Sequence, residues 1–69
     1  MKLSNTLKVW RAKADITQEQ LGIAIGVSRQ TINSIERSKF IPSVQTALKL
    51  AGFFETQVEQ LFSLKGEVK

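Results

Sequence analysis

The sequence predicts a compact, all-α domain of five helices, and three observations lead to that prediction. Apolar residues recur at helical spacing along most of the chain, Ser, Thr and Gly residues stand where helices would begin and end, and there is a single proline. The chain has 69 residues, enough for one domain that buries only about 60% of its unfolded surface. We expect one domain over residues 1–65 and a frayed tail over residues 66–69.

The first helix is predicted from Leu3, Leu7, Trp10 and Ala14, which form one apolar stripe at helical spacing. Trp10 could instead be a stacking platform for single-stranded bases. Its place in the stripe favours a core position. Asp15 marks the end of this helix.

The second helix is predicted over residues 17–25, because the threonine that opens it and Gln20 have the spacing of a capping box. Gly26 can adopt the left-handed conformation that closes a helix, and Ser28 can cap the next one, so the turn between them is short. Gly22 lies inside the second helix, where glycine costs about 1 kcal/mol relative to alanine. We expect its missing side chain to permit close packing of the third helix.

The third helix has an apolar side with Ile32 and Ile35 when residues 28–37 are placed at about 100° per residue. Arginine can bond the O6 and N7 atoms of guanine, and Asn or Gln the N6 and N7 atoms of adenine. A solvated face is the alternative, but such faces usually mix Glu with Lys, and this stretch has no lysine. We therefore predict a DNA-reading surface. Its polar side chains are Arg29, Gln30, Asn33, Ser34 and Arg37.

The segment after the third helix contains Pro42, which cannot continue a helix and indicates a loop. Ser43 can cap a fourth helix. The apolar residues of that helix are expected to be buried, and they are Ala47, Leu48, Leu50, Ala51 and Phe54.

Charge and composition narrow the function classes. Residues 1–39 hold seven Lys or Arg against three acids, and residues 40–69 hold three against three, so the excess lies where a phosphate-facing surface is expected. The chain has no Cys or His and one aspartate, which argues against an enzyme and against the usual zinc sites. We expect no metal, cofactor, small-molecule ligand or membrane span, and a cytoplasmic location.

The residues from Thr17 to Arg37 resemble the helix-turn-helix of the phage repressor and Cro type, the XRE-like family of transcriptional regulators. The positions that carry the resemblance are Gln18, Leu21, Gly22, Ile25, Gly26, Val27, Ile32 and Ile35. The likeness extends from about Leu3 to Leu64. It implies a lambda-repressor-like fold in which the second and third helices form the DNA-binding motif.

The resemblance also implies a regulator, expected to be a repressor, that inserts its third helix into the major groove of a palindromic operator as a homodimer. In similar repressors the residues at the positions of Arg11 and Glu36 form an ion pair. We expect the same pair here, in preference to a free Arg11 that binds phosphate. Two alternatives stay open: the antitoxin of a toxin pair, and a protein-interaction module without DNA binding. The expected base contacts are Arg29, Gln30, Asn33 and Ser34, and the expected backbone contacts are Gln18, Ser28, Thr31, Arg37 and Lys39.

The joint before the last helix departs from the family, which usually has a glycine there, whereas this chain has Glu55, Thr56 and Gln57. Either the joint is strained by a left-handed residue, at a cost of about 1 kcal/mol or more, or the fourth helix ends differently. Thr56 and Glu59 offer an alternative capping box, shifted one residue from the usual start. We expect Leu61 and Phe62 to belong to a last short helix with Val58. The residues that we expect in a dimer interface are Val58, Leu61, Phe62 and Leu64.

Overall fold

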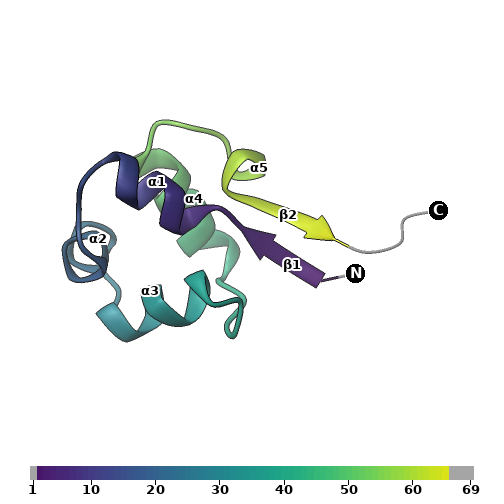
Figure 1. Ribbon diagram of the computed structural model, residues 1–69, viewed down its shortest axis with the longest axis horizontal. Coiled ribbons are helices and arrows are strands. Elements are labelled where there is room, and N and C mark those ends of the chain that lie inside the picture. Colours follow the sequence, from purple (N-terminus) through teal and green to yellow (C-terminus); the bar gives the residue numbers. More distant parts are fainter. Residues whose placement is uncertain (1, 66–69) are drawn as a thin grey trace.

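The computed structural model describes residues 2–65, and in that range the chain forms five helices and two strands (Figure 1). The helices surround one core, and the strands pair as a two-stranded antiparallel ribbon that projects from one end. The predicted tail over residues 66–69 lies outside the described residues. The elements are β1 (Lys2–Asn5), α1 (Leu7–Lys13), α2 (Gln18–Ile25), α3 (Arg29–Glu36), α4 (Val44–Phe53), α5 (Val58–Leu61) and β2 (Phe62–Lys65).

The ribbon corrects the prediction of an all-α fold. Leu3 belongs to β1 and lies opposite Leu64 of β2, so the first helix begins at Leu7 and not at Leu3. Asn5 joins the ribbon to the helices, because its Oδ1 accepts from the Leu7 N–H (3.0 Å) and its Nδ2 donates to the Ile35 carbonyl oxygen (2.9 Å). Leu3 still packs against the core, so its apolar spacing reflects burial from a strand.

The predicted caps at the starts of α2 and α3, and the turn between these two helices, are confirmed. The Thr17 hydroxyl accepts from the Gln20 N–H (3.0 Å), and the Gln20 side chain accepts from the Thr17 N–H (2.8 Å). Gly26 is left-handed with φ of 80°, and Ser28 caps α3 by accepting from the Thr31 N–H (3.0 Å).

Gly22 allows the backbone of the turn to approach α2 closely. A Cβ atom added at this position would lie 2.6 Å from the Val27 carbonyl oxygen and 3.3 Å from Ser28. The Gly22 carbonyl accepts from the N–H groups of Gly26 (2.8 Å) and Val27 (2.9 Å), which fixes the turn against the helix. The predicted close packing is therefore confirmed.

The joint between α4 and α5 follows the strained alternative. Glu55 is left-handed with φ of 55°, and the Thr56 N–H donates to the Ala51 carbonyl oxygen (2.9 Å). The capping box of Thr56 and Glu59 is absent here: α5 begins after Gln57, which makes no side-chain cap.

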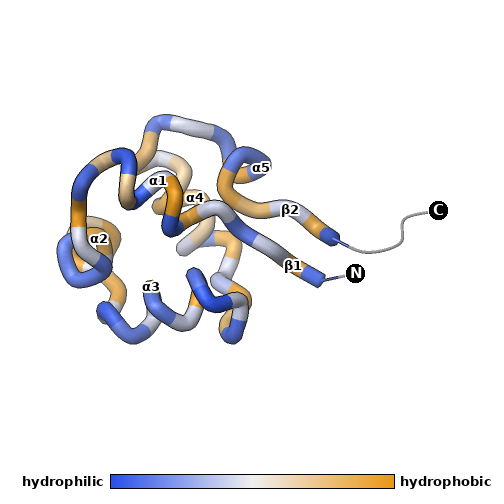
Figure 2. Tube along the Cα trace, in the orientation of Figure 1, coloured by the Kyte–Doolittle hydropathy of each residue, from blue (hydrophilic) through white to orange (hydrophobic). Residues whose placement is uncertain are grey.

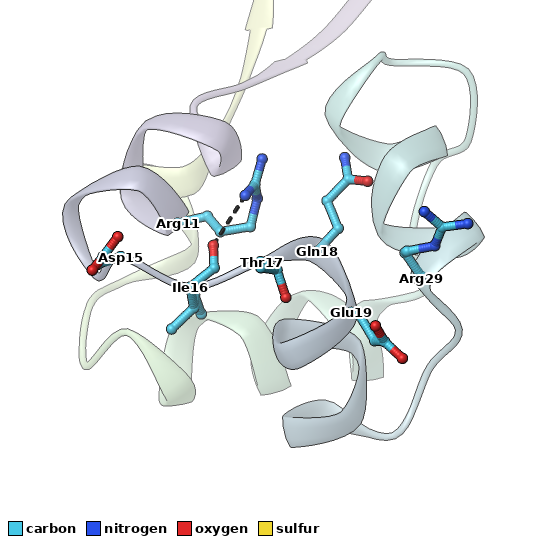
Figure 3. Close-up of a pocket in the computed structure, with 7 residues that line it drawn as sticks. All are labelled: Arg11, Asp15, Ile16, Thr17, Gln18, Glu19 and Arg29. Carbon is cyan, nitrogen blue, oxygen red and sulfur yellow. Dashed lines mark hydrogen bonds between the residues drawn. The ribbon is translucent and has the colours of Figure 1, made fainter.

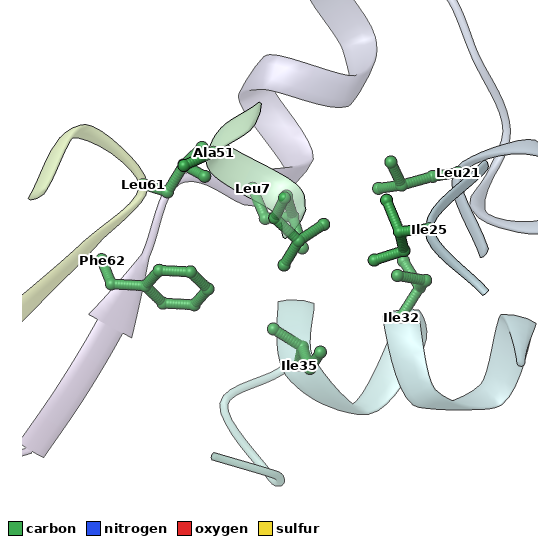
Figure 4. Packing of buried hydrophobic residues seen from close by; sticks show 9 residues of the cluster. Leu7, Leu21, Ile25, Ile32, Ile35, Ala51, Leu61 and Phe62 are labelled. Carbon is green, nitrogen blue, oxygen red and sulfur yellow. The ribbon is translucent and has the colours of Figure 1, made fainter. Parts of the chain in front are cut away.

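The core lies between the helices and the base of the ribbon (Figure 4). Trp10 packs against it and its ring centroid is 5.9 Å from that of Phe54, which confirms its expected core position. Two apolar expectations are wrong, because Leu48 is 58% exposed and Ala14 is an exposed C-cap. The largest fully buried side chains are Leu7, Leu21, Ile32, Ile35, Leu50 and Leu61.

The predicted dimer residues Leu61 and Phe62 belong to this core, so they are corrected from interface to interior. Phe62 also begins β2 and is not part of the last helix. Val58 is partly buried against the core, and Leu64 is exposed.

Candidate nucleic-acid interface

The orientation of α3 follows from its two isoleucines. Ile32 and Ile35 are fully buried against the core, and the capped start at Ser28 fixes where the helix begins. Because residues three and four apart share a helix face, the polar side is turned outward. Hydrophilic residues recur along α3 and the turn after it, whereas hydrophobic residues recur along α4 (Figure 2).

The structure brings most of the predicted DNA contacts together in two hollows that share Gln30. Two cations, Arg29 in the first hollow and Lys39 in the second, give this surface its charge, and no carboxylate of residues 2–65 lines either hollow. We call it the α3 surface. The first hollow is lined by Gln18, Arg29, Gln30 and Asn33, and the second by Ser28, Gln30, Thr31, Ser34, Lys39 and Phe40.

Arg37 is the predicted contact that lies apart from the α3 surface. It lines a different hollow beside β1, together with Lys2, Leu3, Ser38 and Ile41. The helix ends at Glu36, Arg37 is its C-cap, and the chain leaves the line of the helix at Ser38, which is left-handed with φ of 60°.

An ion pair connects α1 to the end of α3, as expected from the resemblance. Arg11 donates from Nε to Oε2 of Glu36 (2.7 Å) and from Nη2 to Oε1 (3.3 Å). Its Nη1 donates to the Ile16 carbonyl oxygen (3.0 Å), the contact drawn in Figure 3. The Glu36 side chain is 4% exposed and that of Arg11 is 17% exposed. The pair ties α1 to the end of α3, and removal of either partner would leave a poorly solvated charge.

Gln18 extends this ion pair to the α3 surface, a connection that the sequence analysis missed. Its Nε2 donates to Oε1 of Glu36 (3.0 Å) and to Oδ1 of Asn33 (3.2 Å). Asn33 and Glu36 are three residues apart on α3 and therefore neighbours on the helix surface. The sequence therefore indicates that Asn33 and Glu36 are neighbours. It does not indicate that α2 places the Gln18 amide between them.

A further hollow at the start of α2 lies beside the α3 surface (Figure 3). It combines side chains from α1, from the link to α2, from α2 and from α3, with both cations and carboxylates. In residues 2–65 there is no cluster of ligand residues suited to a metal ion, and no helix there is long and apolar enough to cross a membrane.

Comparisons with known proteins agree with this geometry. The model of the helix-turn-helix family matches residues 7–61. An uncharacterized HTH-type transcriptional regulator of Methanocaldococcus jannaschii is 47% identical over 87% of this chain and 91% of that protein. Another, from Bacillus subtilis, is 38% identical over 94% of this chain and 98% of that protein. The structure of the P22 c2 repressor protein in complex with a synthetic operator is similar, with a TM-score of 0.74 and 30% identity over 77% of this chain and 80% of that chain.

Proposed function

We propose that this chain, which belongs to the helix-turn-helix family, is a transcriptional regulator. It binds double-stranded DNA, and α3 contacts the bases that determine the sequence preference. The observation that carries the proposal is the α3 surface, where amides, a hydroxyl and two cations gather on one side of a helix whose other side is buried. A helix with such a face fits the major groove. The regulator names of the relatives and the operator complex of the P22 c2 repressor support it.

The proposed base contacts are Arg29, Gln30, Asn33 and Ser34. Arg29 and Gln30 are exposed in the first turn of α3, which is the part of a recognition helix that contacts base edges. Asn33 and Ser34 are half-buried one turn later and line the two hollows. The guanidinium of Arg29 is suited to guanine, because it can donate to O6 and N7 together.

The proposed backbone contacts surround these residues. Lys39 borders the second hollow and supplies charge without base-reading geometry, while Ser28 and Thr31 supply hydroxyls at the start of α3. The Gln18 side-chain amide already donates to two acceptors, so we assign its phosphate contact to the main-chain N–H, which has no acceptor within a helix that begins there. Arg37 would contact a more distant phosphate from the β1 side.

We also propose that the protein acts as a homodimer on a palindromic operator. One α3 reads too few base pairs for strong selectivity, and two copies related by a two-fold axis would read half-sites roughly 34 Å apart. An exposed apolar stripe, Ile41, Val44 and Leu48, runs from the loop after α3 into α4 and is suited to the contact. Ile41 and Leu3 border the same hollow, and Leu3 lies opposite Leu64 in the ribbon. The apolar stripe therefore continues toward the exposed Leu64, which was predicted in the dimer interface.

Occupation of a promoter by such a dimer would repress transcription, and repression is the direction we propose. The experiment that tests the whole proposal is selection from a randomised duplex pool at near-physiological salt, followed by sequencing of the retained duplexes. An enriched inverted repeat is the expected result. Folded protein that enriches no sequence would refute the proposal and favour a protein-interaction module.

A further inference from the structure

We propose that Gln18 is a positioning residue that holds the Asn33 amide in one orientation, so that α3 rejects cytosine at the base that Asn33 faces. The inference rests on the proposed function, because it assigns a rule of recognition to the α3 surface. It starts from a chain of four side chains, Arg11, Glu36, Gln18 and Asn33, which connects the interior ion pair to the first hollow.

The first step is the fixed polarity of Glu36. Its carboxylate is nearly fully buried and pairs with Arg11 through both oxygens. An ionised carboxylate can only accept hydrogen bonds. The amide group of Gln18 that lies 3.0 Å from Oε1 of Glu36 must therefore be its NH2 group, and the Gln18 amide has one permitted orientation.

The second step carries this polarity to Asn33. The Gln18 NH2 group has two hydrogens, and its nitrogen lies within hydrogen-bond distance of two acceptors, Glu36 and Asn33. The Asn33 amide must then present its oxygen to Gln18, at 3.2 Å. Its own NH2 group is left as the donor that the first hollow can offer to a base.

The third step is the chemistry of base edges. In the major groove, guanine offers N7 and O6 as acceptors, adenine offers N7 and thymine offers O4, whereas cytosine offers only its N4 amine, which is a donor. An Asn33 NH2 group that cannot exchange places with its oxygen has no partner on cytosine. Without Gln18 the amide can rotate by half a turn, and its oxygen can then accept from the cytosine amine.

The test uses the randomised duplex selection with the full chain and three variants. Asn33→Ala identifies the base pair that Asn33 reads, because preference should disappear there alone. At that position the wild type should disfavour cytosine by between about 5- and 150-fold. Gln18→Ala should lower this discrimination severalfold, by up to about tenfold where the wild-type value is large, because one hydrogen bond that orients the Asn33 amide is lost. Gln45→Ala, the same change in the exposed first turn of α4, should leave it unchanged.

A fourth variant, Glu36→Gln, tests whether the Gln18 side chain acts by fixing the orientation of the Asn33 amide or only by packing against it. Glu36→Gln keeps the shape of the side chain but can present either an oxygen or an NH2 group to Gln18, so cytosine should again be admitted at the same position. Thermal melts of each variant show whether it is folded, and Glu36→Gln decides the matter if Gln18→Ala does not fold.

Three results would overturn the inference. In the first, the wild type accepts cytosine at the base pair assigned to Asn33. In the second, Asn33→Ala changes the base preference at no position. In the third, the folded Gln18 and Glu36 variants still exclude cytosine while losing affinity for all sequences alike. Each of these leaves an enriched operator and so leaves the proposed function standing. Failure of the wild type to enrich any sequence would instead remove the proposed function on which the inference rests.

Discussion

Gly22 and Gly52 allow one substitution to be made in two helices with opposite expected results. Both glycines lie inside helices, α2 and α4, where alanine is the better helix former. At Gly52 an added Cβ meets nothing within 4 Å, whereas at Gly22 it lies 2.6 Å from the Val27 carbonyl oxygen. Alanine raises helix propensity at both positions. The difference in stability between the two variants therefore measures the cost of the contact with the turn.

The destabilisation expected for Gly22→Ala depends on how far the main chain of the turn can move away from the added Cβ. The Cβ is about 0.8 Å short of an ordinary van der Waals contact, which begins at 3.4 Å. The obstructing atom is main chain, held by two hydrogen bonds to Gly22 itself and by the left-handed Gly26. Overpacking of this kind costs about 1–3 kcal/mol. Because the obstructing atom is main chain and cannot rotate away, we expect a cost in the upper half of that range, about 2–3 kcal/mol. After subtraction of a propensity gain of about 1 kcal/mol, Gly22→Ala should lower the free energy of unfolding by about 1–2 kcal/mol.

Thermal unfolding followed by circular dichroism measures both variants at equal protein concentration. A change of 1 kcal/mol shifts the midpoint by about 4–8 °C in a domain of this size. Gly22→Ala should therefore melt about 5–15 °C below the wild type, and Gly52→Ala a few degrees above it. The DNA affinity of folded Gly22→Ala should also fall, because relief of the contact moves α3 relative to α2. A midpoint for Gly22→Ala at or above the wild-type value would refute the reasoning.

Three further predictions concern the interface, the strained joint and the dimer. Arg29→Ala should relax preference at one base pair by about 1–3 kcal/mol, whereas Lys39→Ala should weaken all sequences alike and reduce the salt slope by about 0.9; uniform loss in both titrations would contradict these roles. Glu55→Gly should raise the melting midpoint by about 2–4 °C, because glycine removes about 1 kcal/mol of left-handed strain at φ of 55° and loses about half of that gain to its greater backbone entropy in the unfolded chain; an unchanged or lower midpoint would count against strain there. Val44→Glu should give monomers in analytical ultracentrifugation, while Ile23→Glu, on a side chain of similar exposure (75% against 77%), should leave the dimer intact; dissociation by both or neither would move the interface elsewhere.

The helix-turn-helix could be predicted because its signals are local. Thr17 and Gln20 are three residues apart, Gly26 needs only its own left-handed backbone, and Ser28 caps the helix that it precedes. Each of these preferences acts within one turn of chain, so the sequence contains the information directly. The two buried isoleucines of α3 then determine which side is turned outward.

The ribbon could not be predicted in the same way, because each strand has four residues and its partner is at the other end of the chain. Alternation over four residues is too short to distinguish a strand from one turn of an amphipathic helix. Leu3 fits both readings, since it packs against the core in either case. A second ambiguity led to the prediction of Leu61 and Phe62 as interface residues. An apolar residue near either end of the sequence can be buried by its own domain or by a second copy of the chain.

The network of Gln18 shows why the candidate site was only partly accessible from sequence. The sequence predicts a separate role for each member, Arg11 and Glu36 as a structural ion pair and Asn33 as a base contact, and it shows no link between these roles. The folded chain connects them, because the turn admitted by Gly22 brings the start of α2 beside the middle of α3. A buried charge then limits which hydrogen-bonding group the half-buried Asn33 amide can offer. The packing of the helix pair and the choice of base are therefore coupled, and a substitution in the interior of the domain should change specificity as well as stability.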